Sequence, residues 1–334
     1  MKNVSYKKSG VNIKAADTFV KGIKGFVASD PLNKVAAFGA LFNISRILKN
    51  YKHPVLVSST DGVGTKLKIA IDTGIHDTVG IDLVGMNVND LVCLGAKPLF
   101  FLDYIAYAKL ESDILKSVMS GMHKGLVESD CSLLGGETAQ MPGMYKKGDY
   151  DLAGFCVGIV DEKKIINGKN IKEGDLVIGL ASSGLHSNGF SLVRKVFNSK
   201  EIKKHEKQLL EPTRIYVKSI LSLLSAKRYP LNAIKGIAHI TGGAFYNKAT
   251  KILPAGVGMV VNKKSWSVPE IFKMIQDKGN VSDKEMYTVF NMGIGMIIVI
   301  DKRYLKEVMG NLIKYNKAYV IGEIVRSKNK MVML

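Results

Sequence analysis

The chain has 334 residues, of which 46% are hydrophobic and 23% are charged, and its formal net charge is +19. This length is enough for two domains, and the composition is that of a globular protein rather than a disordered one. The lysines are spread over nearly every polar segment and arginines are few, so the positive charge does not predict a nucleic-acid-binding protein. A basic field of this kind suits small anionic substrates.

The cysteines and the N-terminus indicate where the protein resides. Cys93, Cys131 and Cys156 stand far apart in apolar stretches, which predicts neither a disulfide framework nor a zinc site. The opening MKNVSYKKSG lacks the apolar core of a signal peptide, and no apolar run approaches the roughly 20 residues of a membrane span. We therefore expect a soluble, cytoplasmic protein with reduced thiols and no membrane contact.

Hydrophobic spacing predicts alternating helices and strands along the chain. In the first half the predicted elements are a helix over residues 17–26, a strand over 55–57, a helix over 76–94, a strand over 98–108, a helix over 112–127 and strands over 131–137 and 150–160. In the second half they are a strand over 176–180, helices over 190–197 and 213–224, a strand over 236–240, a helix over 245–253 and strands over 256–261, 295–300 and 319–325.

A polar stretch over residues 161–169 separates these two halves, since it mixes Lys, Asn and Gly without apolar periodicity. It predicts a first domain at residues 1–165 and a second at 166–334. Both halves mix helices with strands, so the fold class predicted is α/β (α+β).

The stretch SSTDGVGTK ends a buried strand with one carboxylate, two glycines and one lysine, at Asp61, Gly62, Gly64 and Lys66. Exposed backbone N–H groups and Lys66 suit a polyphosphate, and Asp61 suits the Mg²⁺ that accompanies it. The spacing fits neither a Walker A loop nor G-x-G-x-x-G. A plain turn is the alternative interpretation.

Two further carboxylates have similar settings. Asp90 follows Asn89 on an otherwise apolar helix, where a carboxylate must be paired or bound to a cation, and Glu137 follows two glycines after a strand. Either carboxylate could instead have a purely structural role, Asp90 as the cap of a turn and Glu137 as the start of a helix. Taken with Asp61, however, they predict a joint site, and an all-oxygen donor set indicates Mg²⁺ rather than zinc.

The second half contains the loops SSGLHSNGF and AHITGG. The first supplies small donors at a helix start, the arrangement that receives phosphate monoesters, and His186 within it can move protons near neutral pH. His239, among apolar residues just before Thr241, is more simply an interior histidine, although two glycines beside it keep a functional role open.

In this order the loops resemble one family, the phosphoribosylformylglycinamidine cyclo-ligases (aminoimidazole ribonucleotide synthetases) of purine biosynthesis. The resemblance covers almost the whole chain. It is strongest in TDGVGTKLKIA, GIDLVGMNVNDLVCLGAKPLFFLDY, GGETAQMPGMY, SSGLHSNGFSLVRK, LLEPTRIYVKS and FNMGIGM.

The resemblance implies an enzyme that closes an imidazole ring with ATP and Mg²⁺: the formyl oxygen of formylglycinamidine ribonucleotide is phosphorylated, an amidine nitrogen attacks, and phosphate leaves. It also implies a homodimer whose N-terminal domains share a β-barrel, with active sites lined by both subunits. Asp61, Lys66 and His186 would be catalytic, with His186 transferring protons. Asp61, Asp90 and Glu137 would hold the metal.

The remaining site residues follow from the same resemblance. The expected cofactor-binding residues are Lys24, Asp61, Gly62, Gly64, Thr65, Lys66, Asn89, Asp90, Gly136, Glu137 and Thr138. The expected substrate-binding residues are Ser183, Gly184, His186, Ser187, Asn188, Gly189, His239, Thr241 and Gly242.

Some positions depart from the family pattern. After ITGG the family has Gly, then Glu-Asn and Pro-Arg, whereas this chain has Ala244, Asn247, Lys248, Thr250 and Lys251, so Asn247 and Lys248 are discounted as ligands. The alternatives are a related phosphotransferase such as a thiamine monophosphate kinase, and a non-enzymatic basic nucleic-acid-binding protein. Selenophosphate synthetase and a hydrogenase-maturation protein are disfavoured, because the chain lacks their N-terminal and C-terminal cysteines.

Overall fold

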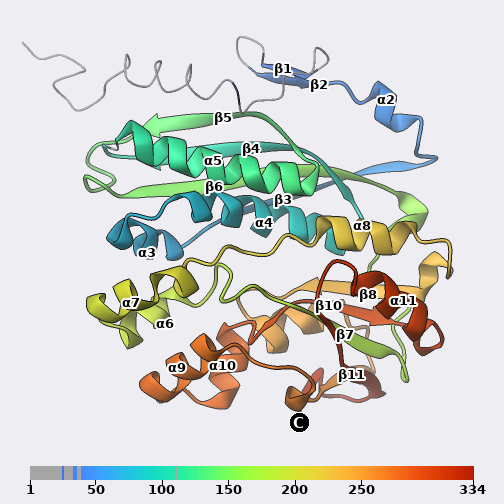
Figure 1. Ribbon diagram of the computed structural model, residues 1–334. Coiled ribbons are helices and arrows are strands. Elements are labelled where there is room, and N and C mark those ends of the chain that lie inside the picture. Colours follow the sequence, from blue (N-terminus) through green and yellow to red (C-terminus); the bar gives the residue numbers. More distant parts are fainter. Residues whose placement is uncertain (1–24, 26–32, 36–38, 110) are drawn as a thin grey trace, which may run out of the picture.

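A computed structural model describes residues 25, 33–35, 39–109 and 111–334, and it contains two separate β-sheets with helices packed on them (Figure 1). The predicted helix over residues 17–26 and the predicted ligand Lys24 therefore fall outside the described part, apart from residue 25. A two-stranded ribbon of β1 (Asn33–Val35) and β2 (Ala40–Phe42) contacts the first sheet at β5, and the short helix α2 (Ser45–Leu48) follows it.

The first sheet has four strands in the order β3-β6-β4-β5. The strands are β3 (Pro54–Gly62), β6 (Tyr150–Asp161), β4 (Lys97–Tyr107) and β5 (Ser132–Gln140). The β3–β6 and β6–β4 pairs are antiparallel, and β4 and β5 run parallel. Its helices are α3 (Lys66–Thr73), α4 (Asp77–Cys93) and α5 (Ser112–Ser129).

The second sheet has six strands in the order β12-β9-β11-β7-β10-β8. The strands are β7 (Leu176–Ala181), β8 (Ile234–His239), β9 (Val257–Val261), β10 (Ile294–Ile300), β11 (Ala318–Arg326) and β12 (Met331–Met333). The accompanying helices are α6 (Phe190–Val196), α7 (Ser199–Leu209), α8 (Val217–Ser225), α9 (Glu270–Gly279), α10 (Asp283–Val289) and α11 (Leu305–Leu312). Short 3₁₀ turns lie at residues 162–164, 231–233, 249–252, 263–265 and 302–304, and a π turn lies at Ala244–Lys248.

Helix α4 lies between the four-stranded sheet and the second half of the molecule (Figure 1), and it contacts β3, β6 and β8. Most of its residues are buried, including Val79, Leu83 and Val88. A helix that is apolar nearly all round is stable only inside a protein, which explains why this segment is so hydrophobic. Some polar residues of α4 nevertheless have partners in the second half, among them Asn89 and Asp90.

None of the helices in the described part of the chain covers the other face of the four-stranded sheet (Figure 1). Large apolar side chains are exposed on it, with Leu56 59%, Phe155 40% and Tyr104 39% accessible. The register places these side chains on one face, since Leu56 pairs with Ile159 and Tyr104 pairs with Ala153. The sheet is open in the described chain and forms no closed barrel.

The mixed α/β fold class is confirmed, and the predicted strands are present. The segment 213–224 is helical only from Val217, because residues 211–216 have no regular secondary structure, and the predicted helix over 245–253 is a π turn followed by a 3₁₀ turn. The boundary predicted at residue 165 falls between the last strand of the first sheet and the first strand of the second, and it stays a prediction. Over the described ranges, no helix combines the length and apolarity needed to cross a membrane.

Candidate active site

A cavity of about 570 Å³ opens between the two halves, and three of the loops singled out in the sequence line it. The end of β3 contributes Asp61 and Gly62, and the loop after it contributes Gly64. The loop before α6 contributes Ser187 and Asn188. The loop after β8 contributes Thr241 and Gly242, and the full lining set is Asp61, Gly62, Val63, Gly64, Met86, Asp151, Leu152, Ala153, Ser187, Asn188, Thr241, Gly242 and Lys248.

Two carboxylates lie at this cavity or beside it. Burial raises the pKa of Asp61 above its ordinary value, and the nearby charge of Asp90 adds to that rise. Burial also acts to raise the pKa of Asp90, but the hydrogen bond from His239 and nearby positive charges outweigh it and lower that pKa. The two residues come from different elements, the end of β3 and the last turns of α4, and the fold brings them within electrostatic range.

The donor chemistry of this pair fits a divalent cation. Both side chains offer only carboxylate oxygens, the ligands that Mg²⁺ prefers, and the charge of Asp90 raises the cost of ionising Asp61. The Oδ1 atom of Asp61 accepts one hydrogen bond, from its neighbour Gly62 N at 2.8 Å. A cation between two such groups would offset their repulsion.

Glu137 does not join this pair within one chain, so one subunit does not bring together the three carboxylates that were expected to hold the metal. Asp61, Asp103 and Gly136 lie in one row across the sheet. Asp61 pairs with Gly154 on β6, Gly154 pairs with Asp103 on β4, and Asp103 pairs with Gly136 on β5. Side chains alternate between faces, so Glu137 points to the opposite face from Asp61, about 14 Å away at ~4.8 Å per strand. In the described ranges no cluster of three or more His, Cys, Asp or Glu residues is arranged to hold a metal.

The neighbours of Glu137 on β5, Gly136 and Thr138, are not among the residues that line the cavity. Thr138 donates its backbone N–H to Glu137 Oε1 at 2.8 Å, and the site is exposed. Gly136 lies so close to β4 that an added Cβ would come within 2.2 Å of Asp103 Oδ1. Close packing against Asp103 is therefore enough to require glycine at position 136, whether or not a cofactor binds there.

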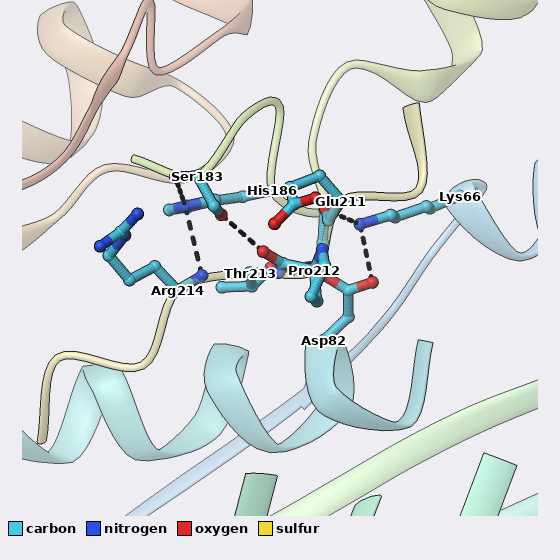
Figure 2. Close-up of polar contacts among 9 residues, drawn as sticks. Lys66, Asp82, Ser183, His186, Glu211, Pro212, Thr213 and Arg214 are labelled. Atoms are coloured by element: carbon cyan, nitrogen blue, oxygen red, sulfur yellow. Dashed lines mark hydrogen bonds and ion pairs between the residues drawn. The ribbon is translucent and has the colours of Figure 1, made fainter. Parts of the chain in front are cut away.

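Lys66 is not available to a phosphate in this structure, which corrects the role expected for it. Its side chain is fully buried, its Nζ lies 2.7 Å from Asp82 Oδ2, and it donates to the carbonyl oxygen of Glu211 at 2.8 Å (Figure 2). Both side chains of the ion pair are 0% exposed. Thr65, just before it, places its Oγ1 3.2 Å from Ser191 Oγ at the start of α6.

Lys248 is the lysine that lines the cavity, although the sequence led us to discount it. It closes the π turn at Ala244–Lys248, and its positive charge acts to lower the pKa of both Asp61 and Asp90. Because this segment departs from the family pattern, sequence reasoning had no ground for choosing Lys248 as a ligand. Its place after a positive-φ glycine, Gly243, was the available signal.

His186 does not face the cavity, which corrects the expectation that it contacts substrate. The ring is fully buried, and its Nε2 accepts hydrogen bonds from the backbone N–H groups of Ser183 at 3.3 Å and Arg214 at 3.4 Å (Figure 2). Burial, followed by the charges of neighbouring groups, lowers its pKa well below the ordinary value. The imidazole is therefore neutral, and because Nε2 accepts, Nδ1 carries the proton.

Ser183 and Gly184 lie on a different hollow, of about 250 Å³, that also involves Glu211 and Glu270. The Ser183 hydroxyl donates to the carbonyl oxygen of Pro212. Gly189 has φ 83°, and an added Cβ would come within 2.1 Å of the Phe290 ring, so this position requires glycine for packing. These expected substrate contacts are therefore parts of the loop's support.

Asn188, in contrast, is placed to bind a ligand. It lines the cavity, and its buried Nδ2 has no hydrogen-bond partner within the part of the chain that the structure describes. A buried amide left without a partner is costly, and a bound ligand can supply the missing acceptor. Its Oδ1 lies where a Cβ on Gly242 would come within 3.1 Å, which keeps these two loops in close contact.

Asn89 and His239 connect the two halves beside the cavity. Asn89 Nδ2 donates to Arg214 O at 2.8 Å, and its Oδ1 accepts from Tyr216 N at 2.9 Å. His239 Nδ1 lies 2.9 Å from Asp90 Oδ1. The amide of Asn89 thus forms its hydrogen bonds with backbone groups. His239 affects the site by lowering the pKa of Asp90.

Comparisons with known proteins identify the family of the chain. The N-terminal domain model of AIR synthase related proteins matches residues 44–160, and the C-terminal domain model matches residues 172–334. The chain is 49% identical to the phosphoribosylformylglycinamidine cyclo-ligase of Thermoanaerobacter pseudethanolicus, over 99% of this chain and 100% of that protein. It is 50% identical to the Clostridium perfringens enzyme of the same name, over 96% and 97%.

Solved structures share the fold at low identity. Hydrogenase maturation protein HypE in complex with ATP aligns with a TM-score of 0.70 and 16% identity, over 97% of this chain and 92% of that one. Thiamine-monophosphate kinase from Stenotrophomonas maltophilia aligns with a TM-score of 0.68 and 14% identity, over 94% and 95%. AaThiL complexed with AMPPCP and TMP aligns with a TM-score of 0.58 and 16% identity, over 100% and 96%.

Proposed function

The chain belongs to the AIR synthase family, whose curated members of about 50% identity are phosphoribosylformylglycinamidine cyclo-ligases, and on this basis we propose that it closes the imidazole ring of purine biosynthesis. The substrates are formylglycinamidine ribonucleotide and ATP. The products are aminoimidazole ribonucleotide, ADP and phosphate. The enzyme class is therefore an ATP-dependent ligase that forms a C–N bond.

The observation that carries the proposal is the cavity between the two halves. It combines an acidic group, Asp61, with a basic one, Lys248, and with the glycines of two loops. Phosphoryl transfer needs mainly positioning and charge neutralisation, and these groups supply both. The fold-related structures with ATP and with AMPPCP support the use of a nucleotide.

Asp61 and Asp90 are the residues that would hold Mg²⁺. When bound there, Mg²⁺ would neutralise charge on the triphosphate. Lys248 adds a positive charge on the same cavity, in place of Lys66, and Asn188 offers an unpartnered N–H to the substrate. His186 acts by holding the backbone N–H groups of Ser183 and Arg214 through its Nε2 atom.

A homodimer completes the proposed site. The exposed apolar face of the four-stranded sheet suits pairing with the same face of a second copy, which would cover Leu56, Phe155 and Tyr104. Glu137 lies on that face, beside Tyr104. We therefore assign Glu137 to the site of the partner subunit rather than to its own.

An ADP-release assay tests the function. Purified protein is given Mg·ATP with formylglycinamidine ribonucleotide, and the imidazole product is measured in parallel with ADP. We expect equal amounts of both products. Thiamine monophosphate is the control substrate, and ADP release with it alone would replace our proposal by a kinase activity.

A further inference from the structure

The ion pair of Lys66 and Asp82 is a buried group of the first half that contacts the second half (Figure 2). Lys66 begins α3, directly after the Asp61 loop, and Asp82 lies on α4. The Nζ–Oδ2 distance is 2.7 Å, and neither side chain is accessible to water. Solvent and salt therefore screen this pair much less than the surface ion pairs of this chain.

The other polar atoms of this pair are satisfied by the second half. Asp82 Oδ1 accepts from Thr213 N at 2.7 Å, from Thr213 Oγ1 at 2.7 Å and from Ser187 Oγ at 3.1 Å. Lys66 Nζ donates to Glu211 O at 2.8 Å. One carboxylate thus binds both the irregular segment 211–216 and the loop that carries the cavity residue Ser187.

The same segment holds the loop before α6 from its opposite side. Pro212 O accepts from Ser183 Oγ, and Arg214 N donates to His186 Nε2 at 3.4 Å. Figure 2 shows the segment between Asp82 on one side and the Ser183 and His186 side chains on the other. A shift of Asp82 would therefore move the substrate side of the cavity.

We propose that Lys66 and Asp82 are positioning residues for ring closure, which fix the 182–189 loop and the 211–216 segment relative to the Asp61 loop. The inference rests on the proposed function and deepens it. A buried ion pair is weak support for stability, since two apolar groups could serve as well, but it fixes one geometry through directional bonds. Reaction rates are sensitive to small displacements of bound groups.

The first test compares three variants. Lys66→Met/Asp82→Asn removes both charges while leaving an oxygen that can accept from Thr213. Thr213→Val removes one hydrogen bond to Asp82 and keeps the side-chain shape. Lys68→Met is the matched control, because Lys68 lies two residues further along α3 with a side chain that is 43% exposed and paired with surface carboxylates.

The expected result is a split between catalysis and nucleotide binding. For the double variant we expect kcat/KM for formylglycinamidine ribonucleotide to fall about 100-fold, and for Thr213→Val about 5-fold, the scale of misplaced reacting groups. The Kd for Mg·ATP, measured by calorimetry, should change less than about threefold, because Asp61, Asp90 and Lys248 remain. Lys68→Met should behave as the unaltered protein.

Amide hydrogen exchange provides a second readout that needs no activity. The double variant and Thr213→Val should both exchange amide hydrogens faster at residues 182–189 and 211–216, while exchange in β10 stays unchanged. Lys68→Met should exchange like the unaltered protein. Normal exchange and normal kcat/KM in folded Thr213→Val and double variants would overturn the inference, as would losses that match only the unfolded fraction. If the unaltered protein closes no ring, the proposed function fails, while the exchange data still decide the positioning role.

Discussion

The Nδ1 atom of His239 lies 2.9 Å from the Oδ1 atom of Asp90, so the last residue of β8 contacts the last turns of α4 beside the cavity. The hydrogen bond and the neighbouring positive charges keep the pKa of Asp90 low despite its partial burial, whereas the pKa of Asp61 is raised. The fold thus holds two carboxylates close together and keeps Asp90 ionised. Such a pair favours a cation between its members.

The first prediction concerns this pair. Asp61→Asn and Asp90→Asn should each lower the rate of ring closure by at least about 100-fold, because each removes a negative charge while keeping the side-chain shape. Loss of folding should be small, since Asp61 lies at the cavity and the Asp90 side chain is 40% exposed. Product formation, Mg²⁺ titration and melting temperature measure these effects. An unchanged rate and unchanged Mg²⁺ dependence in both variants would refute the assignment.

The second prediction concerns Glu137, which lies on the opposite face of the sheet from Asp61. If it acts across a dimer interface, Asp61→Asn and Glu137→Gln should each be inactive alone. Mixed together after dissociation and reassociation, they should recover about a quarter of normal activity, since half of the dimers are mixed and each has one intact site.

Two controls sharpen this experiment. Mixing Asp61→Asn with Asp90→Asn should recover nothing, because both residues belong to the same subunit's share of the site. Phe155→Glu, placed on the exposed apolar face, should give a monomer in analytical ultracentrifugation. No recovery from the Asp61 and Glu137 mixture, with dimers present, would remove Glu137 from the site.

The third prediction concerns Lys248. Lys248→Met should raise the KM for ATP about 10-fold and weaken its dependence on salt, because a positive charge on the cavity is lost. Lys264→Met is the control, since Lys264 is exposed and lies outside the cavity lining. A KM for ATP that responds equally to both substitutions would mean that Lys248 contributes only to the general basic field.

Local sequence patterns predicted the parts of this fold that depend on local physics. The strand ending at Asp61 and the helix carrying Asp90 were both recognisable from hydrophobic spacing. The rule that placed Asp90 at a site, a carboxylate in an apolar helix, applies equally to Asp82, and applying it there would have found the buried ion pair.

Spacing alone could not decide which polar groups meet. Lys66 and Asp61 are close in sequence, yet one enters the core and the other lines the cavity, because α3 begins between them and turns the lysine toward Asp82. Glu137 was separated from Asp61 by sheet register, which depends on strand order and not on local sequence. His186 was predicted to face the substrate, but its ring is buried. A loop of small polar residues around a histidine looks the same in sequence whether the histidine is buried or catalytic.

The last prediction uses Asp103, a carboxyl on β4 whose pKa burial raises to about 7, with the charge of Glu137 adding to the rise. Its unfolded value is near 3.8, so the folded state holds the proton more tightly, and stability is lost as pH rises from about 4 to 7, by at most about 4 kcal/mol. Asp103→Asn, which stays neutral, should therefore raise the melting temperature more at pH 8 than at pH 5. Asp113→Asn, with a side chain that is 90% exposed, is the control and should shift little with pH. Equal effects of Asp103→Asn at both pH values would show that Asp103 does not hold a proton near neutral pH, and its close approach to Gly136 would then be a matter of packing alone.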